Sequence, residues 1–196
     1  ANSCRFDTNA GLNKTAANGT RTKATFSTWV KRSILEDESL LFNSRINASN
    51  HMVIRFTGSD KLEFLNRIGA SNISVYTTDA VYRDTSAWMH VLWIFDTTLS
   101  TSGDRIKLFV NGTRVTDFST STTQGQNTDL AANINTAEYY VAQEYTSGDN
   151  FFDGYMAEVV WLDGIAGSST DFGEFDEDSG IWKPKDVSEL TFGSSG

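Results

Sequence analysis

Apolar and polar residues alternate with a period near two along most of the chain, a pattern that predicts β-strands. Clusters of Ser, Thr, Asn, Asp and Gly between these runs are typical of turns. No window of about twelve residues shows a helical stripe, and the best helix candidate is one turn within 168–175, capped by Ser168 or Ser169. The pattern therefore predicts an antiparallel all-β fold. The strands expected before residue 88 are 25–31, 40–44, 52–56, 62–65, 73–77 and 81–83.

The sequence RIKLFVNGTRV at 105–115 predicts a β-hairpin. Apolar residues occupy every second position of its first strand. Asn111 and Gly112 then provide the two positive-φ positions of a type I′ turn, and the return strand begins at Thr113.

Two further predicted strands, 88–95 and 155–162, are apolar on both faces. In the first, Val91 and Trp93 point to one side and Leu92 to the other. Covering both faces takes a second sheet on one side and loops or a neighbouring subunit on the other. We therefore expect a two-sheet antiparallel jelly-roll sandwich.

The long polar loop 117–135 is the segment we expect to act as one such cover. The tryptophans lie in strand-like runs beside other apolar residues, so we assign them to core or sheet packing. They are Trp29, Trp88, Trp93, Trp161 and Trp182.

The length of 196 residues fits one sandwich domain over 1–185, followed by a tail over 186–196 that we interpret as leading into a further segment. Pro184 is the only proline, and no Gly/Ser linker divides the interior. Because Cys4 is the only cysteine, no internal disulfide can form and stability must come from packing, as in proteins that mature in a reducing cytosol.

Twenty-five acidic and sixteen basic residues give a net charge of −9, which argues against binding to nucleic acid or to an anionic bilayer. No apolar run approaches the roughly 20 residues of a membrane span, so we expect no membrane insertion. The N-terminus lacks the basic and apolar regions of a secretion signal, which would have to lie outside this sequence.

Three segments carry a resemblance to a known family. They are TFSTWVKRS, then RDTSAWMHVLWIFDTTLSTSGDRIKLFVNGTRV, then FFDGYMAEVVWLDGIAGSSTDFGEFDEDSGIWKPK. From about Cys4 to Lys185, the chain resembles the laminin-G/pentraxin-like branch of the concanavalin A-like jelly rolls. Within that branch it is similar to copies in structural proteins of marine tailed bacteriophages and other aquatic viruses. The resemblance implies the fold and leaves the ligand open, because the superfamily includes lectins, hydrolases and inert scaffolds.

Glycoside hydrolysis is one activity that the resemblance implies, since some relatives with this sandwich are β-glucanases. These enzymes place carboxylates at alternate positions of one strand. Glu174, Asp176 and Asp178 have that spacing. However, the shorter Asp178 stands where the second glutamate is needed, and the run lies between glycines in a predicted loop. We therefore expect a solvated acidic turn, no catalytic residues and no enzyme activity. His90, inside a strand beside Trp88, is interpreted as a hydrogen-bonded structural histidine.

Calcium is the one candidate cofactor, and no cofactor is required. The resemblance to pentraxins implies a site that joins a carboxylate in an early loop to a G-Q-E-type segment, and calcium prefers such loop oxygens. Asp60, Glu144 and Asp149 stand at comparable places. The acidic and amide partners of the pentraxin site are not reproduced, because Tyr145 follows Glu144.

A glycan-binding rim is expected around the loop 147–150. Aromatic rings stack on sugar faces, while Asn and Asp side chains bond the hydroxyl groups. Tyr140 and Phe152 nearby are interpreted as core residues instead. The predicted contacts are Tyr139, Tyr145, Asp149, Asn150 and Phe151.

These observations favour a non-enzymatic virion appendage or decoration module that adheres to host-surface glycan. It would assemble in the host cytoplasm, be exposed on the particle surface, and form a homo-oligomer, expected to be a trimer, alongside other virion proteins. Linked copies raise avidity without new contacts. The alternative is a purely structural virion module that mediates protein assembly, and a β-glucanase-type glycoside hydrolase is a less favoured one.

Overall fold

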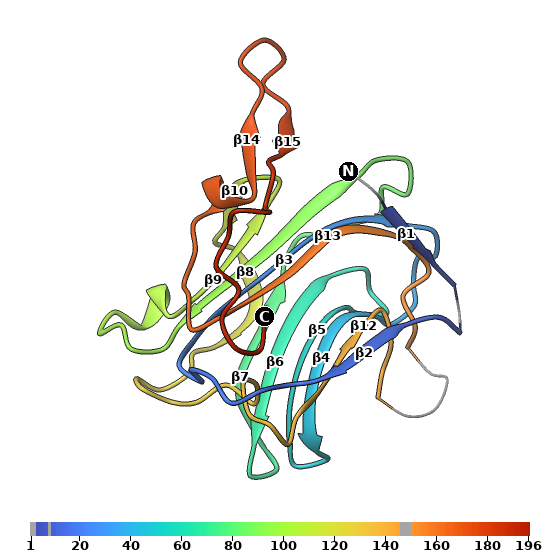
Figure 1. The fold of residues 1–196 in the computed structure, drawn as a ribbon. Coiled ribbons are helices and arrows are strands. Elements are labelled where there is room, and N and C mark those ends of the chain that lie inside the picture. Colours follow the sequence, from blue (N-terminus) through green and yellow to red (C-terminus); the bar gives the residue numbers. More distant parts are fainter. Residues whose placement is uncertain (1–2, 8, 146–149) are drawn as a thin grey trace.

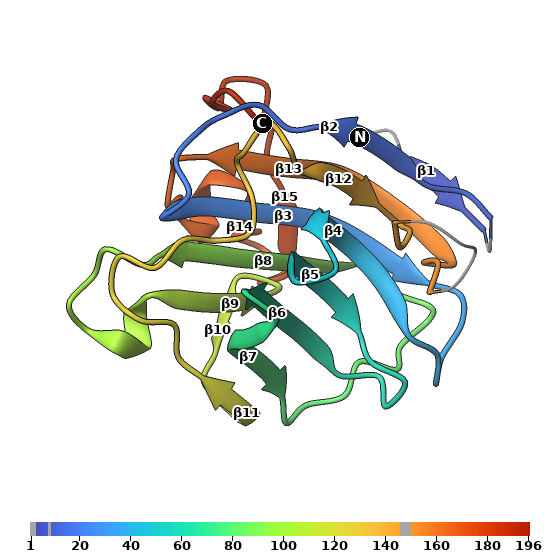
Figure 2. The same cartoon turned by 90° about the horizontal axis from the view of Figure 1, so that it is seen from below.

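The computed structural model describes residues 3–7, 9–145 and 150–196. Two antiparallel sheets stack face to face in a sandwich (Figures 1 and 2). The six-stranded sheet has the order β1 (Ser3–Phe6), β13 (Gly154–Asp163), β3 (Lys23–Arg32), β8 (Met89–Asp96), β9 (Ile106–Val110) and β10 (Thr113–Val115). The seven-stranded sheet has the order β11 (Phe118–Thr122), β7 (Ser71–Thr78), β6 (Leu62–Ile68), β5 (Asn50–Phe56), β4 (Ser39–Asn47), β12 (Glu138–Val141) and β2 (Leu12–Thr15). The predicted two-sheet antiparallel jelly-roll sandwich is confirmed.

The predicted hairpin forms as β9 and β10. Asn111 and Gly112 connect the strands with φ angles of 49° and 74°, as a type I′ turn requires. The side-chain amide of Asn111 also accepts a hydrogen bond from the backbone N–H of His90, at 2.8 Å. The turn is therefore held by the neighbouring strand β8 as well as by its own geometry.

The main core lies between the sheets and is rich in aromatic side chains. Phe42 of one sheet stacks on Trp161 of the other, with ring centroids 4.8 Å apart and planes 14° from parallel. Phe64 similarly contacts Trp93 and Phe95 across the interface, at 5.6 and 4.7 Å. Alternation along each strand directs one set of side chains into this layer and leaves the other set for the outer faces.

A second apolar cluster covers part of the outer face of the six-stranded sheet. Leu92 of β8 and Leu162 of β13 pack there against Phe172, Leu190 and Phe192. This explains why those strands are apolar on both faces: the C-terminal segment of the chain covers them. The expectation that the loop 117–135 would be a cover is wrong, because its buried part belongs to the main core: Leu130, Ala131 and Ala132.

The C-terminal residues stay against the sandwich. Ser195 is buried, and its hydroxyl donates to the carbonyl of Ala17 at 2.5 Å. Its backbone N–H donates to the carboxylate of Asp163 at 3.2 Å, and the ammonium of Lys14 donates to the carbonyl of Gly196 at 2.8 Å.

Three smaller expectations need correction. The segment 81–83 is not a strand, because the N–H of Tyr82 bonds to the carbonyl of Asp60 instead of a sheet partner. Trp88 precedes β8 and is 39% exposed, in contact with the ring of Tyr155. Val159 lies in the predicted strand 155–162, of which both faces were expected to be covered, yet it is 39% exposed because a bulge between Ala157 and Val160 displaces it.

The expected helical turn forms as a 3-10 turn over Ser169–Asp171. Ser168 caps it, since its hydroxyl accepts from the N–H of Thr170 and the carboxylate of Asp171 accepts from the N–H of Ser168. The other helical element is the 3-10 turn Ser102–Asp104. Within the described ranges, no helix has the length and apolar character to cross a membrane.

Candidate functional site

A row of polar side chains crosses the outer face of the seven-stranded sheet. Arg45 of β4 pairs with His51 of β5, and His51 pairs with Arg67 of β6. Their strand neighbours Met52 and Ile68 contact the main core, so alternation turns this row away from it. Directly paired residues of antiparallel strands hold their Cβ atoms about 5 Å apart, so these three side chains are neighbours.

A second row, beside the first, is less polar. Tyr140 of β12 pairs with Asn43 of β4, which pairs with Val53 of β5 and, through it, Leu65 of β6. Tyr140 is half-buried, as are Val53 and Leu65, while Asn43 is only 2% exposed. The face therefore combines the ring of Tyr140, the aliphatic side chains of Val53 and Leu65, and the buried amide of Asn43. All of them lie beside the charged row. The expectation that Tyr140 belongs to the core is wrong, whereas Phe152 is fully buried as predicted.

Three buried polar atoms on this face have no hydrogen-bond partner. They are the Oδ1 of Asn43, the Nδ1 of His51 and the Nε of Arg67. A buried polar atom without a partner costs about 1–3 kcal/mol, and such atoms are rare in folded proteins. These three atoms are grouped on one sheet face and lie beneath its solvent-accessible surface.

The charges of this row are largely uncompensated. Within the described ranges neither Arg45 nor Arg67 forms an ion pair, although Arg67 Nη1 donates to the Asn72 side chain at 3.3 Å. Burial lowers the pKa of His51, and the charges of Arg45 and Arg67 lower it further. His51 is therefore a neutral donor and acceptor between two cations at physiological pH. Glu138, opposite Arg45, accepts a hydrogen bond from the Thr15 hydroxyl at 2.8 Å.

Part of the predicted glycan rim lies at the edge of this face. Tyr145 is 37% exposed, and the guanidinium of Arg45 lies 3.5 Å from the centre of its ring. The Asn150 amide donates to the Glu144 carboxylate at 2.6 Å, and Phe151 is half-buried. The structure thus brings Tyr145 to the polar row, while Asn150 and Glu144 bind each other.

The other two predicted rim residues do not support that site. Tyr139 is 5% exposed, and its hydroxyl both donates to Asn133 Oδ1 at 2.7 Å and accepts from the Asn133 N–H at 2.8 Å. Its role as a glycan contact is therefore wrong, because β12 turns Tyr139 inward and Tyr140 outward. Asp149 lies outside the described residues.

Asp60, the expected early-loop calcium ligand, is instead the centre of a buried ion cluster. Its Oδ1 accepts from Arg32 Nη2 at 3.0 Å and from the N–H of Glu36 at 2.8 Å, and its Oδ2 accepts from Arg83 Nε at 2.8 Å. Burial alone would raise the pKa of Asp60, but these hydrogen bonds outweigh it and hold the pKa below its ordinary value. Because both oxygens face guanidinium or N–H groups, the structure contradicts a calcium-binding role for Asp60. In the ranges that the structure describes, no three His, Cys, Asp or Glu side chains gather as a metal site.

The acidic run 174–178 lies on the hairpin of β14 (Gly173–Phe175) and β15 (Trp182–Pro184), which projects from the sandwich (Figure 1). Asp176 Oδ1 accepts from the N–H groups of Asp178 and Ser179, so it closes the turn. The ammonium of Lys183 lies 3.4 Å from Glu174 and 3.2 Å from Asp176. These carboxylates therefore stabilise the hairpin, as expected for a solvated acidic turn.

His90 is a hydrogen-bonded structural histidine, as predicted. It is fully buried; its Nδ1 accepts from the indole N–H of Trp182 at 3.1 Å, and its Nε2 lies 2.8 Å from the hydroxyl of Ser27. An indole nitrogen can only donate, so the proton of the neutral ring resides on Nε2. Burial lowers the pKa of His90 to about 4.

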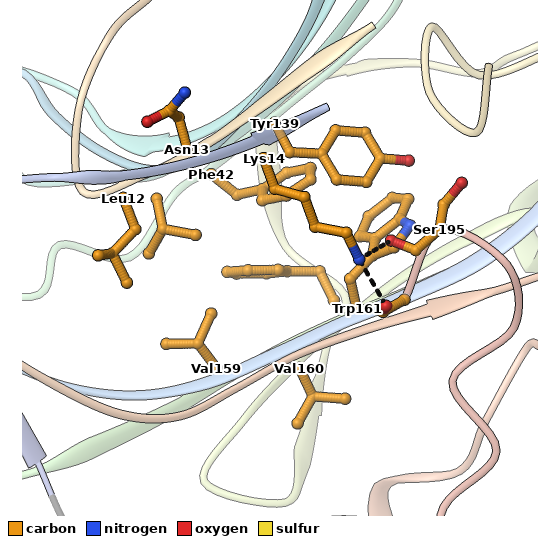
Figure 3. Close-up of a pocket in the computed structure, with 12 residues that line it drawn as sticks. Leu12, Asn13, Lys14, Phe42, Tyr139, Val159, Val160, Trp161 and Ser195 are labelled. Atoms are coloured by element: carbon orange, nitrogen blue, oxygen red, sulfur yellow. Dashed lines mark hydrogen bonds between the residues drawn. The ribbon is translucent and has the colours of Figure 1, made fainter. Parts of the chain in front are cut away.

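A cavity of about 190 Å³ opens between the sheets, beside β2 and β13 (Figure 3). Its inner wall is the aromatic stack of Phe42 and Trp161, and Leu12 and Val159 lie at its entrance. The ammonium of Lys14 is bonded to the carbonyls at the end of the chain, as the dashed lines in Figure 3 show. The cavity is apolar and lacks the converging polar groups that would orient a sugar.

Sequence reasoning missed the residues that make the outer face distinctive: Asn43, Arg45, His51, Arg67 and Tyr140. The alternating polar positions in HMVIRF and LEFLNRI were visible signals. These residues became a site only through the register that aligns the four strands β12, β4, β5 and β6.

Comparisons with known proteins agree with this fold. Residues 6–166 match the family model described as the concanavalin A-like lectin/glucanases superfamily. A search of curated proteins finds no match. Domain 4 of AbnA, a GH43 extracellular arabinanase from Geobacillus stearothermophilus, solved with arabinotriose, gives a TM-score of 0.63 at 16% identity over 86% of this chain and 75% of that one.

Two other solved structures show the same fold. Domains LG4-5 of the mouse laminin α1 chain give a TM-score of 0.58 at 12% identity, over 96% of this chain and 45% of that one. The CBM40 of the Ruminococcus gnavus IT-sialidase, bound to α2,3-sialyllactose, gives 0.52 at 16% identity, over 74% of this chain and 89% of that one. At these identities the likeness concerns the fold alone.

Proposed function

The chain belongs to the concanavalin A-like lectin/glucanase superfamily, and from that premise we propose that it is a non-enzymatic glycan-binding module. Its site is the outer face of the seven-stranded sheet, formed by the polar row of Arg45, His51 and Arg67 with Asn43 and Tyr140 beside it.

The observation that carries this proposal is the cross-strand row of half-buried Arg45, His51 and Arg67, whose two guanidinium groups form no ion pair within the described ranges. Sugar hydroxyls both donate and accept, so one saccharide can bond guanidinium and imidazole groups together. The half-buried ring of Tyr140 and the exposed ring of Tyr145 offer apolar surfaces for sugar faces. Two structural neighbours support the assignment, since AbnA domain 4 was solved with arabinotriose and the CBM40 with sialyllactose.

Tyr145→Ala is expected to weaken glycan binding about tenfold, equivalent to about 1.4 kcal/mol, because it removes the exposed ring that also holds Arg45 in place. Screening the module on a glycan array identifies ligands, and titration calorimetry compares the affinities of the wild-type chain and the variants for them. Tyr155→Ala is the matched control, since Tyr155 is a similarly exposed tyrosine on the other sheet with Arg5 over its ring at 5.4 Å. Loss of binding in Tyr155→Ala alone would move the site to the six-stranded sheet.

The biological setting that we propose is a virion appendage or decoration, in a homotrimer with other virion proteins around it. This setting is supported by the resemblance of the three segments quoted in the sequence analysis, such as RDTSAWMHVLWIFDTTLSTSGDRIKLFVNGTRV and FFDGYMAEVVWLDGIAGSSTDFGEFDEDSGIWKPK, to those of phage structural proteins. We expect the neighbouring genes to encode tail or capsid proteins. A neighbourhood of polysaccharide-degrading enzymes would place the module in a glycosidase system instead.

If the glycan array shows no binding while light scattering shows a stable assembly, the alternative is favoured, namely a structural module that joins virion proteins. Cleavage of laminarin-type polysaccharide that Glu174→Gln abolishes would revive the hydrolase alternative.

A further inference from the structure

We infer that the glycan bound on the outer face of the seven-stranded sheet is acidic, with its carboxylate or sulfate group held by Arg67 and His51. This inference rests on the proposed function and specifies the ligand class of the same site.

The first argument is the location of positive charge in an acidic protein. The chain carries a net charge of −9, yet Arg45 and Arg67 lie on one face without an ion pair in the described ranges. Arg55, on the same face, contrasts with them because its guanidinium pairs with the carboxylates of Glu38 and Glu63. A guanidinium that the fold leaves uncompensated is suited to an anion from outside, since planar N–H donors match carboxylate and sulfate oxygens.

The second argument is the type of hydrogen-bonding group at the β6 end of the row. Arg67 Nε is buried and donates to nothing, while its Nη1 reaches Asn72. A guanidinium N–H can only donate, so its missing partner is an acceptor. The neighbouring His51 can provide a second donor by placing its proton on Nδ1, which is also unpartnered. Both atoms lie beneath the solvent-accessible surface, so an acidic group from outside would bond the outer nitrogens of these two half-buried side chains.

The third argument is the shape of the remaining surface. The row beside Arg67 contains the aliphatic Val53 and Leu65, then the buried Asn43 and the ring of Tyr140. Neighbouring strands are about 4.8 Å apart, so this row extends for about three strand spacings, the length of a short oligosaccharide. An acidic group at Arg67 would thus leave the neutral part of the sugar over Val53, Asn43 and Tyr140.

The test uses two matched pairs of probes that differ only in charge. They are alginate oligosaccharide against its carboxyl-reduced form, and κ-carrageenan oligosaccharide against its desulfated form. We expect the acidic member of at least one pair to bind at least tenfold more tightly. Arg67→Gln should remove that preference, because it weakens binding of the acidic member far more than binding of the neutral member, and Arg45→Gln is a second variant of the same row. Lys31→Gln, with the same charge change on the six-stranded sheet, should preserve it.

Equal binding of the acidic and neutral members, unaffected by Arg67→Gln, would overturn this inference and leave the proposed function standing. Absence of binding to all four probes and to a broad glycan array would overturn both. A preference that Lys31→Gln removes as strongly as Arg67→Gln would show bulk electrostatic attraction, which also contradicts a specific acidic subsite. Circular dichroism and melting temperature confirm that each variant is folded.

Discussion

Asp60→Ala is expected to lower the free energy of unfolding by about 3–5 kcal/mol, because removing one partner of a buried ion pair leaves an uncompensated charge. Asp60 is fully buried and Arg32, which would be left behind, is 3% exposed. The carboxylate also joins three separate parts of the chain: Arg32 on β3, the N–H of Glu36 in the following loop, and Arg83 in the segment before β8. Urea unfolding monitored by tryptophan fluorescence measures the change.

The matched controls separate the ion cluster from a general loss of acidic charge. Asp79→Ala removes an exposed carboxylate at the end of the nearby strand β7 and should leave stability nearly unchanged. Arg83→Gln should cost much less than Asp60→Ala, because the Arg83 side chain is 55% exposed and water replaces its contacts. A loss in Asp60→Ala no larger than that in Asp79→Ala would contradict the structural role that we assign to Asp60.

Asp60 also shows why candidate ligands are difficult to identify from sequence. In the sequence it is an acidic residue in a polar turn, which suits calcium binding as well as an ion pair. Its partners Arg32 and Arg83 lie 28 and 23 positions away in the chain. Only the packing of the β5–β6 turn against two other segments brings them to the carboxylate.

The strands themselves could be predicted because their signals are local. Asn111 and Gly112 encode a turn by backbone conformation alone, and the alternation around them marks which side chains point inward. The row of Arg45, His51 and Arg67 has no such local signal. It depends on strand pairing and on bulges beside Arg45 and Arg67, and a shift of one residue would send these side chains to the core.

Tyr139 and Tyr140 illustrate that sensitivity. They are adjacent and chemically identical, and the prediction assigned Tyr139 to the surface and Tyr140 to the core. The structure has the reverse, because β12 begins at Glu138 with an outward side chain. A one-residue error in register therefore exchanged the candidate ligand contact and the core residue, while the fold class remained correct.

The stability of the protein is expected to fall by about 3 kcal/mol between pH 6.5 and pH 4 on account of His90 alone. An ordinary histidine has a pKa of 6.5, and burial lowers that of His90 to about 4. As the pH falls through this window the unfolded chain binds the proton first, so unfolding becomes more favourable. The contribution of neutral His90 to the free energy of unfolding is complete above pH 6.5 and is lost once the pH is below the pKa of His90 in the folded chain.

The structural reason lies in the contacts of the ring. His90 lies beside the rings of Trp29 and Trp182, at 5.0 and 6.0 Å between centroids, and its Nδ1 accepts the Trp182 N–H. A proton on Nδ1 would place two donors against each other and break this bond. Because Trp182 starts β15, protonation would release the β14–β15 hairpin from the six-stranded sheet.

Urea unfolding at pH 7, 6, 5 and 4 measures this loss, and His90→Gln serves as the reference because it keeps an amide donor but does not titrate. Carboxylates also titrate near pH 4, so the expected result is the difference between the two proteins: the wild-type chain should lose about 3 kcal/mol more than the variant. NMR titration of the His90 ring provides an independent measurement on the folded chain. A ring that titrates near 6.5, or equal pH dependence in both proteins, would show that the contact between His90 and Trp182 does not govern stability in acid.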